Sequence, residues 1–310
     1  MSIVFFGTPA FAADILTHLI SCQREIVAVV SRPDKPQGRS RKLVPSAVKL
    51  VAESHSIPHF QPEKASMMIP TLESLQADFF VVVAYGEILT QKVLDLPKVA
   101  CVNVHASLLP KYRGAAPIQR AIIEGQKETG ITIMHMVKKM DAGDIILQLS
   151  LPIEISASYG SLELEMRMIS SIALLKALDQ LKKGTATRQV QDENAVSYAP
   201  KIELEDCQIF WNQSSVEIHN LIRGTNPEPG AWCPIWIDGE EKRLKIYTSS
   251  LRNEIVLSAK EFILESKNKL LIGCGIGTLE IREVQLEGKK RMDAAEFCRG
   301  FPNGRWKLSP

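Results

Sequence analysis

The sequence has no long apolar run. None of its stretches reaches the ~18 consecutive apolar residues that a membrane-spanning helix needs. The apolar stretch at residues 1–11 lacks the basic flank, the longer apolar core and the cleavage site of a secretory signal. We therefore expect a cytoplasmic protein that has no membrane partner.

Paired cysteines are also missing. The 6 cysteines, at positions 22, 101, 207, 233, 274 and 298, form no CxxC pair, and no histidine stands at metal-ligand spacing from them. Scattered cysteines of this kind are typical of reduced thiols in the core of a cytoplasmic protein. The sequence therefore predicts neither disulfides nor a bound metal.

Charge of either sign is not in excess. Lysine and arginine total 37 against 35 acidic residues, so the net charge of +2 does not by itself indicate a polyanionic partner. A GxGxxG dinucleotide fingerprint is absent as well. Any nucleic-acid site must instead come from local clusters of basic residues.

The sequence does contain a β-α-β opening. Residues 3–6 read as a buried strand, a turn at Gly7 follows, and apolar residues at helical spacing lead to a second apolar strand at 26–30. Together they predict a Rossmann-like α/β domain with a mostly parallel sheet. Further apolar runs predict additional strands of this sheet, at residues 79–84, 100–104, 131–137 and 145–151.

The second half of the chain changes character. Helical spacing over 161–183 predicts the helix that closes the first domain, and a polar stretch follows it. Short β-like runs such as RLKIYT, EIVLSA and TLEIREVQL then predict a smaller, OB-like antiparallel β-barrel. We therefore expect a monomer with an α/β domain at 1–189, a linker at 190–207 and a C-terminal barrel at 208–310.

The most informative segment is NVHASLLP, which begins at Asn103. Alternation along a strand places Asn103 and His105 on the same face. An amide and an imidazole there suit acyl transfer, because Asn103 could donate a hydrogen bond to the carbonyl oxygen that gains negative charge, and His105 could donate or relay a proton. Asp141 is the expected partner of His105, because parallel-sheet topology would bring its loop to the same sheet edge.

Each motif has a plainer interpretation on its own: a hydrogen-bonded pair at a sheet edge, and a turn at residues 141–144. Together they resemble the 10-formyltetrahydrofolate-dependent formyltransferase family, whose signature is Asn-x-His-x-Ser-Leu-Leu-Pro with a later Asp-x-Gly. The segments FFGTPAFA, RPDKPQGRSRKLVPSAVK, VVVAYGEIL, HASLLPKYRGAAPIQRAI, ETGITIM and MDAGDI extend the resemblance over nearly the whole length. They match the branch that acts on methionyl initiator tRNA.

The resemblance implies an activity. The formyl group of 10-formyltetrahydrofolate would pass to the free amino group of methionyl initiator tRNA, leaving tetrahydrofolate, with Asn103, His105 and Asp141 as the catalytic residues. Asp144 would help to order the folate or its own loop. The other residues implied to line the folate site are Tyr85, Gly86, Glu87, Ile88, Leu89, Ser107, Leu108, Leu109 and Pro110.

Basic residues gather in RPDKPQGRSRKLVPSAVK, where two prolines and a glycine predict a mobile loop. On its charge alone, this loop could simply be solubilising. The resemblance implies that it reads the tRNA through Arg32, Lys35, Arg39, Arg41 and Lys42, with Arg39 matching the family's loop arginine. A second basic set would let the barrel hold the tRNA body: Lys242, Arg243, Lys245, Lys289, Lys290 and Arg291.

Two other functions stay open on the sequence alone. A formyltransferase acting on a small amine, such as a nucleotide sugar, would need neither the basic loop nor the barrel. A non-enzymatic RNA-binding protein would not need the Asn, His and Asp together. The chain also departs from the family pattern at Glu87, Thr90 and Glu228, which concerns the pterin pocket and the packing between domains. His135, between two methionines, is interpreted as a packed or edge histidine.

Overall fold

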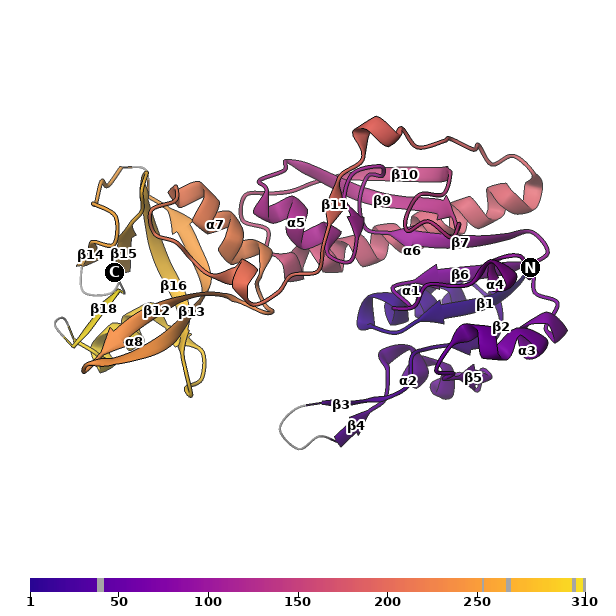
Figure 1. Cartoon of the computed structure of the whole chain (residues 1–310), viewed down its shortest axis with the longest axis horizontal. Helices are drawn as coiled ribbons and strands as arrows, with labels where there is room; N and C mark the ends of the chain where they lie inside the picture. Colours follow the sequence, from indigo (N-terminus) through magenta and orange to yellow (C-terminus); the bar gives the residue numbers. More distant parts are fainter. Residues whose placement is uncertain (38–41, 253, 266–268, 303–304, 309–310) are drawn as a thin grey trace. The chain divides into compact units, whose positions relative to one another are not determined.

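In a computed structural model the chain is described over residues 1–37, 42–252, 254–265, 269–302 and 305–308. It forms two units (Figure 1). Unit 1 contains residues 1–117, 128–152 and 163–199, and unit 2 contains residues 118–127, 153–162 and 200–310. Residues 190–199 of the segment predicted as a linker group with unit 1, and the two short pieces 118–127 and 153–162 group with unit 2.

The apolar runs of unit 1 pair into one sheet, in the order β10-β9-β7-β6-β1-β2-β5. The strands from β7 to β5 in this order run parallel, whereas β9 is antiparallel to both of its neighbours. The predicted Rossmann-like α/β class is therefore confirmed. The strands are β1 (Ser2–Gly7), β2 (Glu25–Val30), β5 (His59–Phe60), β6 (Phe79–Val83), β7 (Ala100–His105), β9 (Glu128–His135) and β10 (Ile145–Pro152).

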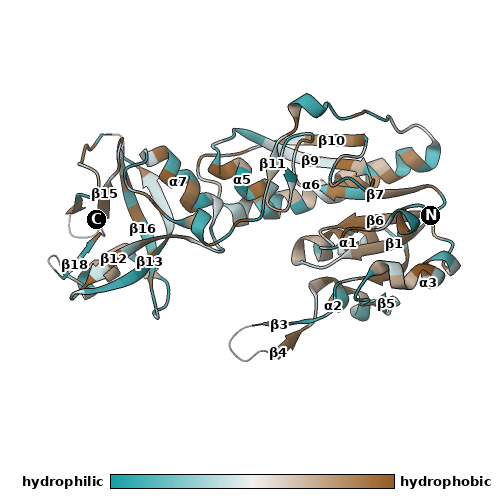
Figure 2. Ribbon diagram, in the orientation of Figure 1, coloured by the Kyte–Doolittle hydropathy of each residue, from teal (hydrophilic) through white to brown (hydrophobic). Residues whose placement is uncertain are grey.

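The strand order reverses between β1 and β6. From β1 the chain passes through helix α1 (Ala10–Ser21) to β2 on one side, whereas β6 pairs with β1 on the other side. Both strands are apolar over most of their length (Figure 2). Their interior residues are buried. In open α/β sheets, ligands bind outside the carboxyl ends of the strands at such a switch point. Here those ends are Gly7 and Val83, which are partners in the register.

Helices and short elements complete the first half of the chain. The described ends of the basic segment pair as an antiparallel hairpin, β3 (Lys35–Gln37) and β4 (Lys42–Val44), where a loop was expected. No helix in the described ranges has the length and apolar character that crossing a bilayer requires. The remaining elements are α1 (Ala10–Ser21), α2 (Ala47–Ser54), η1 (Ala65–Met68), α3 (Ile69–Ser74), α4 (Gln91–Leu94), β8 (Arg113–Gly114), α5 (Pro117–Ile123), α6 (Tyr159–Lys183), η2 (Glu193–Ala195) and β11 (Tyr198–Ala199).

Unit 2 is built on a curled antiparallel sheet of half-barrel form, in the order β14-β15-β16-β13-β12-β18 with β17 paired to β16. Alternate residues of β12 are buried, so one face of the sheet covers the core and the other is partly exposed. Its elements are η3 (Glu205–Cys207), α7 (Ser215–Gly224), β12 (Ala231–Ile237), β13 (Glu240–Leu251), β14 (Phe262–Glu265), β15 (Lys269–Gly273), β16 (Thr278–Leu286), β17 (Met292–Asp293), α8 (Ala294–Gly300) and β18 (Trp306–Leu308).

Candidate active site

His105 and Asp141 meet at the end of β7. The Nδ1 atom of His105 lies 3.7 Å from Oδ2 of Asp141, and the imidazole is 6% exposed. The other ring nitrogen, Nε2, lies 2.9 Å from the carbonyl oxygen of Tyr112. Because a carbonyl oxygen only accepts hydrogen bonds, Nε2 is the nitrogen that carries a proton. The opposite ring nitrogen, Nδ1, faces the Asp141 carboxylate. A second proton on Nδ1 would make a cation whose charge Asp141 stabilises.

Asp141 reaches His105 by a different route from the one predicted. Strand β9 runs antiparallel to β7, with Val102 opposite His135, so the chain leaves β9 near the middle of β7. The loop then folds back onto β9. A Cβ atom added at Gly143 would lie 1.7 Å from the carbonyl oxygen of His135, so only glycine fits this return. Local loop geometry, and not parallel topology, brings the carboxylate to the site.

The Asp141 carboxylate is held by backbone. The N–H of Gly114 donates to its Oδ2 at 2.8 Å, and Asp141 itself has a φ of 50°, in the left-handed region that aspartate tolerates better than most residues. Gly114 has a φ of 128°, and a Cβ there would lie 2.6 Å from the carbonyl oxygen of Ala199. Glycine is therefore required at the position that supports the carboxylate.

Asn103 alternates with His105 along β7 and lies on the same face of the sheet. Its side chain is half-buried, and no group within the described ranges hydrogen-bonds its amide. A positioned amide without a protein partner is suited to bind a carbonyl oxygen of a ligand. By contrast His135, on β9, is a half-buried histidine whose pKa is lowered by burial and by the nearby Arg188. Its role as a packed or edge residue stays a prediction.

The segment from Tyr85 to Leu89 follows β6 at the switch point. Tyr85 is buried against the edge of the Phe6 ring, and burial raises its pKa to about 12. Gly86 and Ile88 are exposed, and the backbone N–H groups of residues 86–89 have no hydrogen-bond partner among the residues that the structure describes. Free backbone donors beside an apolar wall suit the polar edge of a flat heterocycle.

The second segment implied to line the folate site is residues 107–110, and several of its polar groups already form hydrogen bonds within the protein. Ser107 is fully buried and its hydroxyl donates to the carbonyl of Lys111, while the N–H of Leu109 donates to Thr132. Leu108 and Pro110 are half-buried. Asp144 is ion-paired with Arg188. Within the described ranges, no three His, Cys, Asp or Glu side chains gather as a metal site would need.

The basic hairpin is anchored at its base by ion pairs. Arg32 donates to the carboxylate of Glu87 at 3.0 Å and to the carbonyl of Glu63 at 2.8 Å. Lys49 pairs with Asp34 at 2.7 Å, and this contact raises the pKa of the Lys49 ammonium. Of the predicted tRNA contacts, Lys35 is exposed and Lys42 begins β4, whereas Arg39 and Arg41 lie outside the described residues. The departure at Glu87 thus has a structural partner in Arg32.

In unit 2, basic side chains lie against aromatic rings. The guanidinium of Arg243 is 4.3 Å from the centroid of Trp232, and that of Arg291 is 3.3 Å from the centroid of Tyr247. The ammonium of Lys245 donates to the carbonyl of Pro229. Lys289 and Lys290 are exposed in the turn after β16, and Lys242 pairs with Glu240. Cations placed over rings suit stacking with nucleotides and contact with phosphates.

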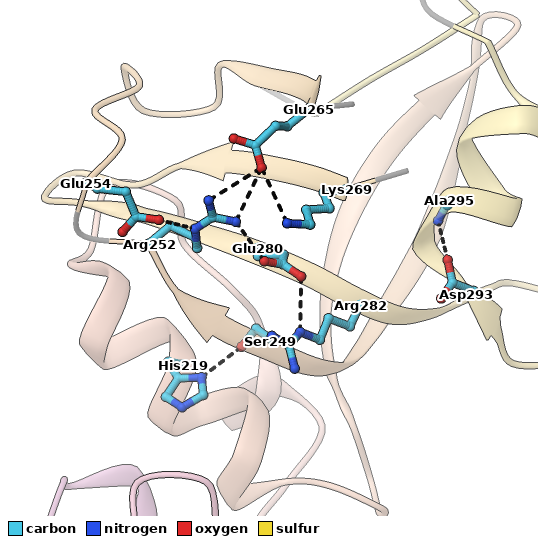
Figure 3. A network of polar contacts seen from close by, with 10 residues as sticks. All are labelled: His219, Ser249, Arg252, Glu254, Glu265, Lys269, Glu280, Arg282, Asp293 and Ala295. Atoms are coloured by element: carbon cyan, nitrogen blue, oxygen red, sulfur yellow. Dashed lines mark hydrogen bonds and ion pairs between the residues drawn. The ribbon is translucent and has the colours of Figure 1, made fainter. Parts of the chain in front are cut away.

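Another part of unit 2 carries acidic and basic side chains that pair with one another. Arg252 contacts three carboxylates, those of Glu254, Glu265 and Glu280, and Glu280 also accepts from Arg282 (Figure 3). The carboxylates raise the pKa of Arg252. These basic groups are neutralised by their neighbours. Positive charge that is free to meet a polyanion is therefore restricted to other parts of unit 2.

Two residues near the site were missed from the sequence. Arg113 is 1% exposed, and both its Nε and Nη2 donate to the side-chain oxygen of Gln191. Gln191 in turn donates to the carbonyls of Asp141 and Gly143. Arg113 stood inside a matched segment, but Gln191 lay in the polar stretch interpreted as a linker, where no periodicity marks a buried residue.

Comparisons with known proteins cover both units. The formyl transferase family matches residues 1–178, and the formyl transferase C-terminal domain matches residues 201–302. The methionyl-tRNA formyltransferase of Protochlamydia amoebophila is 52% identical over 99% of this chain and 98% of that protein. The enzyme of the same name from Geobacter metallireducens is 43% identical over 97% of this chain and 96% of that protein.

Solved structures share the fold at lower identity. WlaRD, a sugar 3N-formyl transferase crystallised with dTDP and 5-N-formyl-THF, aligns with a TM-score of 0.67 at 22% identity, over 94% of this chain and 99% of that one. HypX from Aquifex aeolicus, in complex with tetrahydrofolic acid, aligns with a TM-score of 0.67 at 17% identity over 97% of this chain, which spans about half of HypX (47%). The full-length identity to curated relatives shows that the chain belongs to the methionyl-tRNA formyltransferase family.

Proposed function

We propose that the chain transfers the formyl group of 10-formyltetrahydrofolate to the free amino group of methionyl initiator tRNA, giving N-formylmethionyl-tRNA and tetrahydrofolate. The observation that supports this most strongly is that His105 pairs with Asp141 on the same face of β7 that presents the unpaired amide of Asn103. The likeness to relatives named for this reaction, over both units, supports the choice of acceptor.

The reaction follows from these three side chains. The amine nitrogen attacks the formyl carbon, a new C–N bond forms, and the carbonyl oxygen becomes an oxyanion. Asn103 donates to that oxygen. His105 donates through Nδ1, which is free to do so because its 3.7 Å separation from Asp141 is longer than a hydrogen bond. The Asp141 carboxylate stabilises the charged imidazole while the oxyanion forms.

Product formation then needs one net proton transfer. The attacking nitrogen becomes an ammonium, which loses a proton toward the Asp141 carboxylate through water. The bond between the formyl carbon and N10 of the folate breaks, and N10 takes up a proton to give tetrahydrofolate. The site moves this proton over a short path because acid and base groups lie within one buried cluster.

The switch point supplies the donor site. The backbone donors at residues 86–89 and the exposed Ile88 fit a pterin ring, whose edge carries several hydrogen-bonding atoms. The proposed tRNA contacts are Lys35 and the loop arginines Arg39 and Arg41, with Lys42. Arg32 joins them once it leaves Glu87. The basic and aromatic residues of unit 2, such as Arg243 and Trp232, would bind the tRNA body.

The test mixes the protein with 10-formyltetrahydrofolate and methionine-charged initiator tRNA, and N-formylmethionine is measured after deacylation. Parallel reactions contain uncharged tRNA, free methionine or an amino sugar nucleotide. Formylation of the charged tRNA alone is expected. Formylation of the amino sugar in place of the tRNA would replace this proposal with a small-amine formyltransferase, and no transfer to any acceptor would remove the enzymatic function.

A further inference from the structure

Four side chains of unit 1 form a clasp around the loop that carries Asp141. The clasp consists of Arg113, Lys139, Gln191 and Glu193. Its centre is the contact between Arg113 and Gln191, in which Nε and Nη2 of the guanidinium donate to one Oε1 atom at 3.1 and 2.8 Å. Both residues are buried, at 1% and 5% exposure. Their mutual hydrogen bonds offset part of the cost of burying these polar groups, although Nη1 of Arg113 has no partner among the described residues.

The amide nitrogen of Gln191 holds the loop directly. It donates to the carbonyl oxygen of Asp141 at 2.9 Å and to that of Gly143 at 2.7 Å, on either side of Ala142. A glutamine is suited to this place because its oxygen accepts from a guanidinium while its nitrogen donates twice. No charged or apolar side chain of similar size offers both functions.

Glu193 closes the other side of the clasp. Its carboxylate accepts from Arg113 at 2.8 Å and from Lys139 at 2.6 Å, and these contacts lower its pKa to about 2. Lys139 precedes Asp141 by two residues, so the loop is held both before and after the carboxylate. Glu193 is half exposed, and this arm therefore contributes less than the buried Gln191 arm.

The backbone beside Arg113 contacts both members of the site. The carbonyl of Tyr112 accepts from Nε2 of His105, and the N–H of Gly114 donates to the carboxylate of Asp141. Burial of the Arg113 side chain thus fixes the peptide that orients the imidazole and the carboxylate. The same side chain also holds Gln191 through hydrogen bonds. Arg113 therefore supports both the backbone that contacts His105 and Asp141 and the glutamine that contacts the loop.

From these contacts we infer that Gln191, held by Arg113, is a positioning residue that keeps the Asp141 carboxylate facing His105 for formyl transfer. The role rests on the proposed function. It acts through the loop backbone, because Gln191 contacts Asp141 through the main-chain carbonyl and not through the carboxylate. Gln191 lies in the segment 190–207 that was predicted to be a linker, so this segment also contributes a residue that supports the site.

Gln191→Glu is the sharpest variant. It keeps the acceptor for Arg113, so the guanidinium stays paired, but it removes both donors to the loop and adds a negative charge beside Asp141. We expect kcat to fall about 10- to 100-fold, as for ångström-scale misplacement, with little change in KM for either substrate.

Gln189→Glu is the matched control, because Gln189 is exposed two residues away and only its backbone pairs, with Ile145. It should retain the wild-type kcat and KM. Gln191→Leu, which adds no charge, should lower kcat to a similar extent, again with little change in KM. It serves as the test if Gln191→Glu fails to fold.

Hydrogen exchange gives a readout that does not need activity. Peptides covering residues 138–144 should exchange faster in either Gln191 variant than in the wild type or in Gln189→Glu. Wild-type turnover and wild-type exchange in a folded Gln191 variant would overturn the inference. A wild type that formylates nothing would instead remove the proposed function, while the exchange experiment would still report whether Gln191 holds the loop.

Discussion

The transfer site and the basic surfaces of this protein are built in opposite ways. At the site, His105 and Arg113 are nearly inaccessible and each is fixed by protein partners. On the basic surfaces, Lys35, Lys289 and Lys290 are exposed. A fixed, buried site places charge where a transition state develops it, whereas exposed cations attract a polyanion over a distance that salt controls. The two regions should therefore fail under different perturbations.

The largest expected effect falls on the buried region. Asn103→Ala removes the unpaired amide, and the loss of one oxyanion donor should lower kcat about 100-fold or more, with little change in KM. Asn103→Asp keeps the shape but cannot donate, so it should lose a similar factor. Formylation kinetics at saturating folate would measure both. Near-normal turnover in a folded Asn103→Ala variant would exclude this residue from the chemistry.

Salt tests the exposed region. Raising the salt concentration from about 50 to about 200 mM should weaken tRNA binding about 10- to 100-fold if ~3 phosphate contacts form. Folate binding should stay nearly constant, because backbone donors in a pocket are not in competition with ions. Titrations of each ligand across the salt range would measure the two slopes. Equal slopes would contradict the division between a chemical site and an electrostatic surface.

Glu87→Gln tests a residue that belongs to both regions, because Glu87 follows β6 at the switch point and pairs with Arg32 at the base of the basic hairpin. The carboxylate of Glu87 holds Arg32, and its loss should free one cation beside the basic hairpin. We expect tRNA affinity at low salt to rise about two- to fivefold, the scale of one exposed charge. Binding titrations would measure it. Glu63→Gln is the matched control, because the Glu63 side chain is exposed and this residue contacts Arg32 only through its backbone carbonyl.

An equal rise in both variants would mean that general charge removal, and not release of Arg32, causes the change. No rise in either would mean that Arg32 does not meet the tRNA. Either outcome would show which cations at the base of the hairpin contribute to tRNA binding.

Much of the fold could be predicted from the sequence, because buried parallel strands are continuous apolar runs. Residues 79–83 of β6 are an example, and the α/β class and the family were both confirmed. The antiparallel direction of β9 could not be predicted, because direction depends on which neighbour pairs with a strand and not on its own composition. The hairpin at Lys35–Gln37 and Lys42–Val44 carries turn residues that are equally compatible with a loop.

The site was predictable to the extent that its residues lie on a periodic strand. Asn103 and His105 follow from alternation, and the structure brings His105 to Asp141, while their catalytic roles stay predictions. Gln191 had no such signal, because a buried amide in an irregular segment is specified only by the groups that it contacts. Polar side chains with a structural task are thus the part of a site that local pattern cannot indicate.

The smallest expected effect concerns a buried polar group far from any chemistry. His219, in α7, is 7% exposed; its Nε2 donates to the carbonyl of Ile155, and its Nδ1 accepts from Ser249. Burial lowers its pKa, the Ile155 carbonyl partly opposes this, and Arg223 lowers it further. The unfolded chain, with a histidine pKa of about 6.5, then binds the proton more readily. The free energy of unfolding should therefore fall as pH drops from about 6.5 toward the lowered pKa.

Tryptophan fluorescence isolates this effect, because the 4 tryptophans, at positions 211, 232, 236 and 306, all belong to unit 2. Between neutral and mildly acidic pH, the melting temperature reported by these residues should fall by about 2–4 °C. His219→Asn cannot be protonated in this range, so its transition should depend less on pH. Because the group lies outside the proposed site, kcat at pH 7 should not change. An unaltered pH dependence in His219→Asn would assign the acid sensitivity to other groups of unit 2.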